Sequence, residues 1–354
     1  MPVLNPEALI DNLAGNIRRM HTDSNINRAE LDLSGGIDSA VMAGLLTLAV
    51  GRGNTTFIFL GINSNPDAYE RAKGLTDALG ERLINFDGTT LFNGLLTQMK
   101  AKMTLAGYDI DEVDARIAAD PTILGSIRST LRAPWGRAAN RLTGGGIRHG
   151  TGNECEDRWL RFYQKGGDGE VDTNPISMLS KGEVYQLARY LGKRLNAVEA
   201  FDRINNATPS ADLWGNGDVH NDESEIGNYL GVKGYPYYSY INADGTYRTV
   251  GLIERVSRAC DEPAGVVWQA DGYGNTWGEV LFSDLGTMDT DTVLKQMSNL
   301  TPFTGIAQTD VVAVLKSARR IERVTRHKWN PSCPALTLRS DLVSAGILTN
   351  TLPA

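Results

Sequence analysis

The chain has 354 residues, of which 41% are hydrophobic and 22% charged, and its formal net charge is -7. This composition is that of a globular protein with one large domain or two ordinary ones, and it excludes a low-complexity chain. The acidic balance disfavours a dedicated nucleic-acid-binding protein. No apolar run approaches the length of a membrane span.

The N-terminal stretch MPVLNPEALIDNLAG lacks the basic start and apolar core of a signal peptide. The cysteines Cys155, Cys260 and Cys333 lie far apart, so they match neither a disulfide framework nor the ligand spacing of a zinc site. We therefore expect a cytoplasmic protein that is not bound to a membrane.

Helix and strand patterns alternate over the first part of the chain. In chain order, they predict a helix over 7–22, a strand over 29–33, a helix over 37–50, a strand over 55–62, a helix over 65–80 and a strand over 82–87. Asn65 is the expected N-terminal cap of the helix over 65–80, with Pro66 at its first position and Gly80 at its end. This alternation predicts an α/β fold with a doubly wound parallel sheet.

The rest of the chain is mainly helical, with one exception. We expect helices over 89–142, broken at Gly107 and Pro121, then a strand and Gly-rich turn over 144–153, a short helix from 154, a loop over 166–175, and helices over 181–193 and 308–328. Residues 235–300 contain β-prone runs around Asp244-Gly245 and predict a β-rich excursion within a single domain of residues 1–354. This excursion could be a lid, a dimer arm or decoration.

The stretch LDLSGGIDSA, residues 31–40, joins the first strand to a helix through two glycines. Glycines let backbone N–H groups approach a ligand closely, and a helix N-terminus attracts anions. The turn carries neither the G-x-G-x-x-G nor the G-x-x-x-x-G-K-[ST] pattern. Asp38 would repel a bare phosphate, so its presence implies a bridging Mg²⁺. A plain strand-to-helix turn capped by Ser34 is the structural alternative.

The complete S-G-G-I-D-S hexapeptide resembles the signature loop of the ATP pyrophosphatases. That superfamily cleaves ATP between its α and β phosphates to adenylate a substrate. The resemblance implies an adenine nucleotide alpha hydrolase-like fold, which is Rossmann-like, and ATP as co-substrate.

Later stretches resemble the NAD synthetases in particular. They are HGTGNECEDRWLRFYQKGGDGEVDTNPI at 149–176, LSKGEVYQLARYLG at 179–192, TPSADLW at 208–214 with NDESEIG at 221–227, and TRHKW at 325–329. All occur in the family's order. The resemblance implies a ligase that amidates nicotinate adenine dinucleotide (deamido-NAD) to NAD with ammonia, through an acyl-adenylate and with release of AMP and pyrophosphate.

Site residues follow from the resemblance, motif by motif. The catalytic residues would be Asp38, Lys181 and Asp168, and the Mg²⁺ ligands Asp38 and Glu156. ATP would be bound by Ser34, Gly35, Gly36, Ser39, Ile62, Thr151, Lys181 and Ser210. The acceptor would be bound by Arg132, Asp168, Asp172, His327 and Lys328.

Several of these residues also have ordinary structural interpretations. Glu156 lies in a run of acidic residues that could be a solvated helix face, and its spacing to Asp168 leaves Asp157 open as the metal ligand. Lys181 could simply follow Ser180 at a helix start, and His327 could be an ordinary surface residue.

Some features depart from the family pattern. Thr130 stands in SIRSTLR where the family has another arginine. Arginines recur at near-helical spacing at Arg128, Arg132, Arg137 and Arg141, and could form a cationic face for a dinucleotide or merely a solvated one. Trp329 replaces the arginine of H-K-R.

Many NAD synthetases carry an N-terminal glutaminase domain. Here the Gly-rich loop begins at Ser34, so we expect no such domain. Free ammonia is therefore the expected donor, and the resemblance implies a homodimer. Another adenylating ATP pyrophosphatase, such as a tRNA-modifying or other amide-forming ligase, is the alternative, and the net charge of -7 disfavours it.

Overall fold

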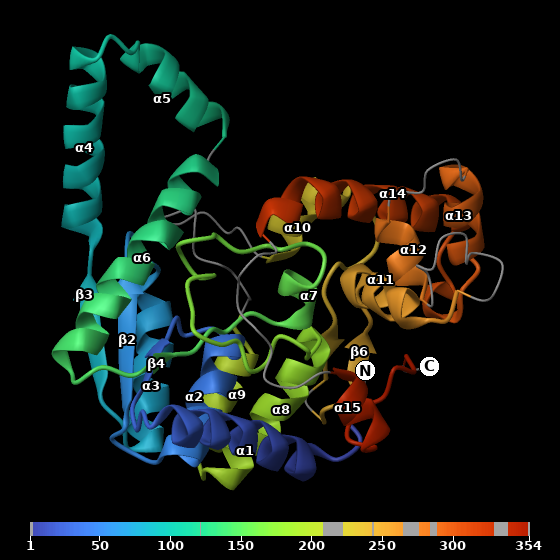
Figure 1. Cartoon of the computed structure of the whole chain (residues 1–354), viewed down its shortest axis with the longest axis horizontal. Coiled ribbons are helices and arrows are strands. Elements are labelled where there is room, and N and C mark those ends of the chain that lie inside the picture. Colours follow the sequence, from blue (N-terminus) through green and yellow to red (C-terminus); the bar gives the residue numbers. More distant parts are fainter. Residues whose placement is uncertain are drawn as a thin grey trace.

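The computed structural model describes residues 3–120, 122–207, 222–242, 244–264, 276–283, 289–328 and 339–352. Figure 1 shows a sheet with its covering helices beside a cluster of C-terminal helices, with the segments after β4 running between them. The central sheet and its helices confirm the predicted α/β fold.

Within the described ranges, four parallel strands form the central sheet in the order β3–β2–β1–β4. They are β1 (Ala29–Asp32), β2 (Thr55–Gly61), β3 (Leu83–Asp87) and β4 (Ile147–Arg148). β2 is buried along its whole length, because it has a strand on each side and helices on both faces. The chain runs from β1 outward to β3 and then places β4 on the other side of β1. The strand order thus reverses between β1 and β4, where sheets of this kind bind ligands.

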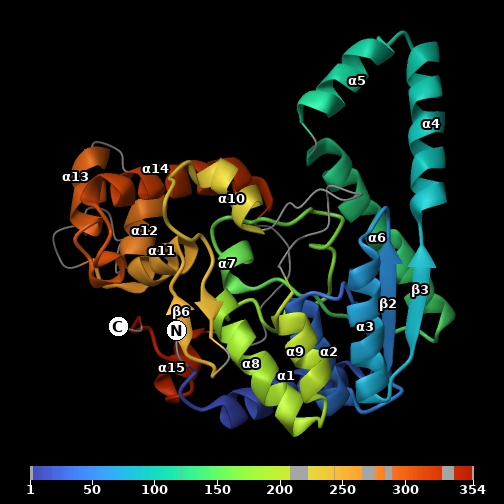
Figure 2. The ribbon, with the colours of Figure 1, turned by 180° about the vertical axis from the view of Figure 1, so that it is seen from behind.

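Helices cover both faces of the sheet, as a doubly wound fold requires. α2 (Ile37–Val50) and α3 (Pro66–Leu79) pack on one face, and α6 (Thr122–Leu142) packs on β1 and β2 from the other. A second layer beyond α2 consists of α1 (Pro6–Ser24), α8 (Lys181–Arg194) and α9 (Val198–Asn205) (Figure 2). The helix α9 was not predicted; the other helices named here match the predicted ones to within two residues at each end.

The ends of α3 show how local chemistry sets a helix boundary. The side chain of Asn65 accepts a hydrogen bond from the N–H of Asp67 at 2.9 Å, and Pro66 takes the first helical position. Gly80 ends the helix in the left-handed conformation, with φ at 69°, and its N–H bonds to the carbonyl of Asp77. The structure confirms both boundaries.

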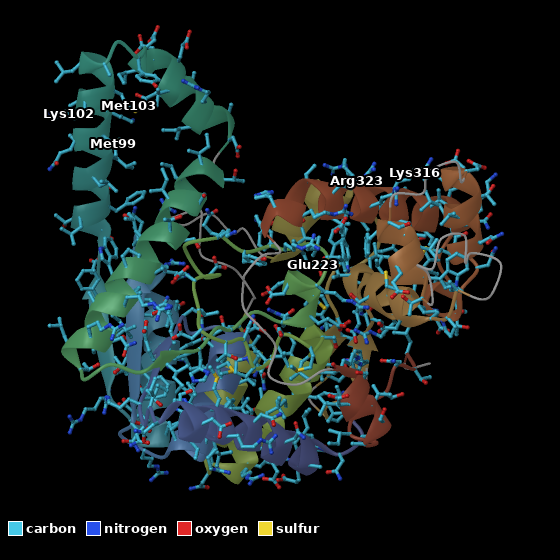
Figure 3. The ribbon with its side chains drawn as sticks, in the orientation of Figure 1. Met99, Lys102, Met103, Glu223, Lys316 and Arg323 are labelled. Carbon is cyan, nitrogen blue, oxygen red and sulfur yellow. The ribbon has the colours of Figure 1, made fainter. Side chains whose placement is uncertain are left out.

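Two helices project from the body as an arm (Figure 1). They are α4 (Thr89–Leu105) and α5 (Ile110–Ala119), joined by a turn in which Gly107 has a φ of 86°. Among their described residues, only Phe92 is buried. Met99, Lys102 and Met103 all lie on the projecting part of α4 (Figure 3).

The prediction of a β-rich excursion over 235–300 is wrong for the described residues. The strands there are β5 (Tyr240–Ile241) and β6 (Tyr247–Thr249), which form the expected hairpin. Three helices follow: α11 (Leu252–Asp261), α12 (Trp277–Phe282) and α13 (Thr290–Met297). In α11 the buried side chains recur at helical spacing, and this periodicity outweighs the local content of β-forming residues. Residues 265–275 lie outside the described part.

The C-terminal helices build a second apolar core with the segment after α7 (Glu154–Asp157). Its remaining helices are α10 (Asp222–Leu230), η2 (Thr301–Phe303) and α14 (Gln308–Thr325), and the chain continues through η3 (Arg326–Lys328) to α15 (Arg339–Ser344), which packs on the first core. Trp159 and Leu160 lie fully within the second core. No helix of the described part is both long and apolar enough to cross a membrane.

Candidate active site

The S-G-G-I-D-S turn directly follows β1, at the end of the sheet where the strand order reverses between β1 and β4. Gly35 has a φ of 77°, and a Cβ atom there would overlap the backbone carbonyl of Ala68 in α3, so only glycine fits. The hydroxyl of Ser34 accepts from the N–H of Gly36 at 3.2 Å and lies 3.1 Å from the hydroxyl of Ser39. No described side chain caps α2, so its first N–H groups are left as donors for an anion.

A lysine and two carboxylates meet beside this turn. Nζ of Lys181 lies 2.6 Å from Oδ2 of Asp38 and 3.0 Å from Oε1 of Glu156. Lys181 is the first residue of α8, which a capping box between Ser180 and Glu183 anchors. The lysine side chain is only 4% exposed, so its charge acts where water screens little. The structure thus joins three residues that the sequence analysis singled out.

The turn after β4 contributes to the same cluster through an asparagine. Asn153 donates from Nδ2 to Oδ1 of Asp38 at 3.0 Å, and its own Oδ1 accepts from the N–H groups of Cys155 and Glu156. Asn153 therefore caps α7 and orients Asp38 at once. The predicted short helix from 154 ends at Asp157. Trp159 and Leu160 then enter the second core, and Arg161 takes a left-handed φ of 47°.

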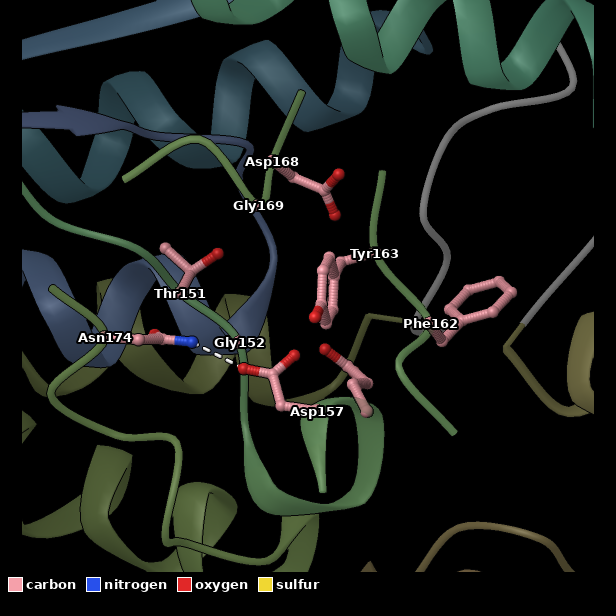
Figure 4. A pocket seen from close by; sticks show the side chains of 9 residues that line it. Thr151, Gly152, Asp157, Phe162, Tyr163, Asp168, Gly169 and Asn174 are labelled. Carbon is pink, nitrogen blue, oxygen red and sulfur yellow. Dashed lines mark hydrogen bonds between the residues drawn. The ribbon is translucent and has the colours of Figure 1, made fainter. Parts of the chain in front are cut away.

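A pocket opens next to this cluster (Figure 4). It is lined by Thr151, Gly152, Glu156, Asp157, Phe162, Tyr163, Asp168, Gly169 and Asn174. Asp157 accepts a 2.5 Å hydrogen bond from Nδ2 of Asn174 at its floor. Burial, and then the charges of Glu156, Asp168 and Asp38, raise the pKa of the Asp157 carboxyl well above its usual range. The pocket therefore carries an excess of negative charge that a cation would relieve.

The two aspartates expected near the acceptor differ in their surroundings. Asp168 lines the pocket and accepts from the hydroxyl of Ser129 at 2.7 Å and from the N–H of Gln164 at 2.8 Å. Asp172 instead pairs with Arg137 at 3.2 Å and accepts from the N–H of Arg148 at 2.7 Å. Burial raises the pKa of Asp172, but these two partners more than offset it and hold the pKa below its usual value. Asp172 is not among the residues that line the pocket.

This chain resembles known proteins over most of its length. The model of the NAD synthase family matches residues 9–242. This chain belongs to the NAD synthase family. The NH(3)-dependent NAD(+) synthetase of Carboxydothermus hydrogenoformans is 28% identical over 255 residues, covering 72% of this chain and 93% of that protein. The one from Archaeoglobus fulgidus is 30% identical over 264 residues, covering 73% and 89%.

Solved structures share the fold of this NAD synthase family member. The NMN synthetase from Francisella tularensis gives a TM-score of 0.51 at 24% identity, covering 63% of this chain and 82% of that one. A glutamine-dependent NAD(+) synthetase from Cytophaga hutchinsonii gives 0.52 at 15% identity, covering 92% and 49%. At these identities the likeness supports the fold alone.

The C-terminal tail of this NAD synthase family member reaches the pocket through Lys328. Its Nζ donates to the carbonyls of Arg161 at 3.0 Å and Tyr163 at 2.7 Å, and Tyr163 lines the pocket. Burial lowers the pKa of Lys328, although the charge of Asp168 opposes the shift. His327 is exposed, and its ring lies against the carbonyl of Val324.

Other expected site residues are scattered or lie outside the described part. Ile62 is buried directly after β2, and Ser210 belongs to the residues that the structure does not describe. Arg128 is buried with its guanidinium 5.4 Å from the ring centre of Phe92, whereas Arg137 pairs with Asp172. Arg132 lies near Asp32. The arginines of α6 therefore have separate surroundings and do not form one cationic face.

The sequence analysis missed two groups of residues. Asn153 and Asn174 orient the acidic cluster, and nothing but their place in the quoted stretch 149–176 marked them. Glu30 and Asp32 contact Arg148 across the strands. Two carboxylates in a short buried strand were a signal, because buried acids need a partner.

Proposed function

We propose that this chain is an ammonia-dependent NAD synthetase. It amidates deamido-NAD to NAD, using ATP to form an acyl-adenylate and releasing AMP and pyrophosphate. Membership of the NAD synthase family, and its resemblance to synthetases named NH(3)-dependent, support this ligase activity. The observation that carries the mechanism is the meeting of Asp38, Glu156 and Lys181 beside the S-G-G-I-D-S turn.

The turn and Lys181 supply what adenylation needs. A carboxylate becomes a good electrophile only when one of its oxygens becomes part of a good leaving group, and AMP provides that group. The pyrophosphate that departs builds up negative charge. The N–H groups of α2 and the hydroxyls of Ser34 and Ser39 would bind it, and the ammonium of Lys181 would offset its charge.

Mg²⁺ fits the donors present. Asp38 and Glu156 would hold it, and when bound it supplies positive charge at the phosphates. Across the described ranges, no three acidic, histidine or cysteine side chains are grouped to hold a metal by themselves. This agrees with the usual habit of Mg²⁺, which takes one or two carboxylates and completes its shell with substrate phosphates and water. The raised pKa of Asp157 shows the same excess of negative charge.

The acceptor would occupy the pocket beyond the acidic cluster. Tyr163 offers a ring face at its wall, and Asp168 is held in place by Ser129 and Gln164. The carboxylate of Asp168 would accept a hydrogen bond from an N–H or O–H group of the acceptor or from ammonia. Lys328 would hold Tyr163 in its place in the pocket wall by donating a hydrogen bond to the carbonyl of Tyr163.

The proposal is tested by incubating the protein with ATP, Mg²⁺, ammonia and deamido-NAD and measuring AMP and NAD together. We expect both to form in equal amounts, and we expect Asp38→Ala to abolish both while its circular dichroism stays that of the wild type. Release of AMP with tRNA, but not with deamido-NAD, would instead favour a tRNA-modifying ligase.

We propose further that the protein is a homodimer whose interface includes the arm. Leu91, Leu95 and Met99 on α4 and Tyr108 after it are exposed apolar side chains, and β3 next to them is an edge strand with Ile84 exposed. A monomer rarely leaves so much apolar surface open on one element. In sedimentation, Leu91→Glu with Met99→Glu should give the monomer mass, whereas Val324→Glu, at an exposed site on α14, should not.

A further inference from the structure

An arginine is buried between the two strands that carry the active-site turns. Arg148 in β4 forms ion pairs with Glu30 and Asp32 in β1, at 2.5 Å from Nη2 to Oδ2 of Asp32. The side chains of Arg148 and Glu30 are 3% and 0% exposed. The side chain of Asp32 is 29% exposed. We call these three residues the triad.

The strands that the triad joins are otherwise weakly paired. β1 and β4 share only two residue pairs, Ala29 with Ile147 and Glu30 with Arg148. Beyond them, β1 runs into the turn at Ser34, and β4 runs into the turn at Thr151. Arg148 stands opposite Glu30 in the register but also reaches forward to Asp32, on the side of the two turns. The triad therefore extends the connection between the strands toward the active site.

α6 closes over the triad. A Cβ atom at Gly136 would overlap Nη1 of Arg148 and would lie 2.8 Å from oxygens of both Glu30 and Asp32. The glycine thus lets the helix backbone approach the three charged groups closely. Arg148 and Glu30 are shielded from water, whereas 29% of the Asp32 side chain stays exposed. One oxygen of each carboxylate has no hydrogen-bond partner in the described part. The arginine is therefore the main group that offsets the negative charge of the two carboxylates.

Stability alone does not explain such a triad. Desolvation of buried charges cancels most of their attraction, and apolar side chains of the same volume are often as stabilising. What apolar side chains lack is the directed geometry of a guanidinium, which holds two carboxylates at set positions.

We propose that Arg148 is a positioning residue: through Glu30 and Asp32 it sets the spacing between the Ser34–Ser39 turn and the Thr151–Asn153 turn, which must both contact ATP. This inference rests on the proposed function for its substrate, and ATP binding alone can test it. Asn153 joins the two turns at Asp38, so a change in their spacing also misplaces the catalytic carboxylate. Arg148 itself touches no reacting atom.

The test compares three variants with the wild type. Asp32→Asn removes one arm of the triad and leaves the buried pair of Glu30 and Arg148 intact. Arg148→Lys keeps the charge but not the two-armed geometry. The triple change Glu30→Gln, Asp32→Asn and Arg148→Met leaves no unpaired buried charge. Arg194→Met is the matched control, since Arg194 also bridges two carboxylates, Glu7 at 3.1 Å and Asp11 at 2.6 Å, but on the surface.

We expect the three triad variants to bind a non-hydrolysable ATP analogue roughly 10- to 100-fold more weakly in calorimetry, because small misplacements at a site cost that much. Their kcat/KM for ATP should fall in proportion. The KM for deamido-NAD should rise less, because only the second of the two turns, through Thr151 and Gly152, lines the acceptor pocket, whereas ATP contacts both turns. Arg194→Met should change none of these values.

The inference is overturned if Asp32→Asn melts at the wild-type temperature and binds the analogue with wild-type affinity. If the Arg148 variants fail to fold, the melting temperature and analogue affinity of Asp32→Asn still test the inference, because this variant leaves the more buried pair of Glu30 and Arg148 unchanged. If the wild type binds the analogue but forms no NAD, the proposed function fails, and the binding comparison still judges the role of Arg148.

Discussion

Lys181 and Asp38 are 143 positions apart in the chain and 2.6 Å apart in the structure, from Nζ to Oδ2. The lysine begins α8, and the aspartate lies in the first turn of α2. Glu156 shares the same ammonium at 3.0 Å. The single positive charge of the ammonium offsets one of the two negative charges, which would otherwise repel the phosphates of ATP. We therefore expect the ammonium to exchange a carboxylate for a phosphate oxygen when ATP binds.

Replacing Lys181 by Met should reduce kcat for AMP formation by about 100- to 1,000-fold, which is typical for removing one group that stabilises developing charge. Lys193→Met on the same helix is the control, because Lys193 is exposed and lies near the ring of Tyr190. Initial rates of AMP release measure both variants. Equal rates for Lys181→Met and the wild type would remove the lysine from the mechanism.

Asp157→Asn should stabilise the protein at alkaline pH. The pKa of Asp157 is raised in the folded state by burial and then by the charges of Glu156, Asp168 and Asp38. A folded state that holds a proton more tightly loses stability as the pH rises through the window between the unfolded and folded pKa values. The variant escapes this loss, so its melting temperature should exceed that of the wild type at pH 8 by about 2–4 °C.

The gain should disappear below about pH 4, where the carboxyl is protonated in both states. Asp23→Asn, at an exposed position of α1, should show no gain at any pH. Mg²⁺ should raise the melting temperature of the wild type more than that of Asp157→Asn, because it relieves the same repulsion. A melting temperature for the variant at or below that of the wild type at pH 8 contradicts the prediction.

A buried histidine pair should make the protein sensitive to acid. Nε2 of His149 lies 3.0 Å from Nε2 of His21, whose Nδ1 lies 2.7 Å from the carbonyl of Ile26. That carbonyl can only accept, so Nδ1 of His21 carries the proton and Nε2 of His149 donates. Burial, and then the charge of His21, lower the pKa of His149 to about 3, against a weaker opposing effect of Asp172.

The unfolded chain protonates this histidine near pH 6.5 and the folded chain does not. The free energy of unfolding therefore takes its full value, as far as His149 is concerned, above that pH. It falls as the pH drops toward 3, by at most about 1.4 kcal/mol per pH unit. His149→Gln should flatten the dependence of the unfolding free energy on pH, measured in urea between pH 7 and pH 4.5. An unchanged slope would show that the pair is not the acid-sensitive element.

The tail residues Lys328 and His327 should differ in their effect on the acceptor. Lys328→Met releases the carbonyls of Arg161 and Tyr163, so the pocket wall loosens, and the KM for deamido-NAD should rise about tenfold with a smaller change in kcat. His327→Ala should change neither value by more than about twofold, because the ring is exposed and contacts only the carbonyl of Val324 in the bonds described. Steady-state kinetics with varied deamido-NAD separates the two. Equal effects would contradict the separate placement of the two side chains.

Local patterns in the sequence were sufficient for many elements but not for residues 235–300. The boundaries of α3 follow from Asn65, Pro66 and Gly80, whose chemistry acts within a few residues. α11 was missed because its aromatic and β-branched neighbours suggested strands. Only its packing on the second core shows that the buried side chains repeat with the period of a helix and not of a strand. The early end of α7 has the same cause, since Trp159 and Leu160 leave the helix to enter that core.

The amino-acid sequence by itself determined the α/β alternation, the family and the Gly-rich turn proposed to bind phosphate, because each depends on residues that are neighbours in the chain. Only the tertiary structure decided that Lys181 contacts both Asp38 and Glu156, that Asp157 rather than Asp172 lines the pocket, and that Arg148 pairs with both Glu30 and Asp32. These contacts join segments far apart in sequence. Their energy comes from burial and from charge at short distance, and neither exists until the chain has folded.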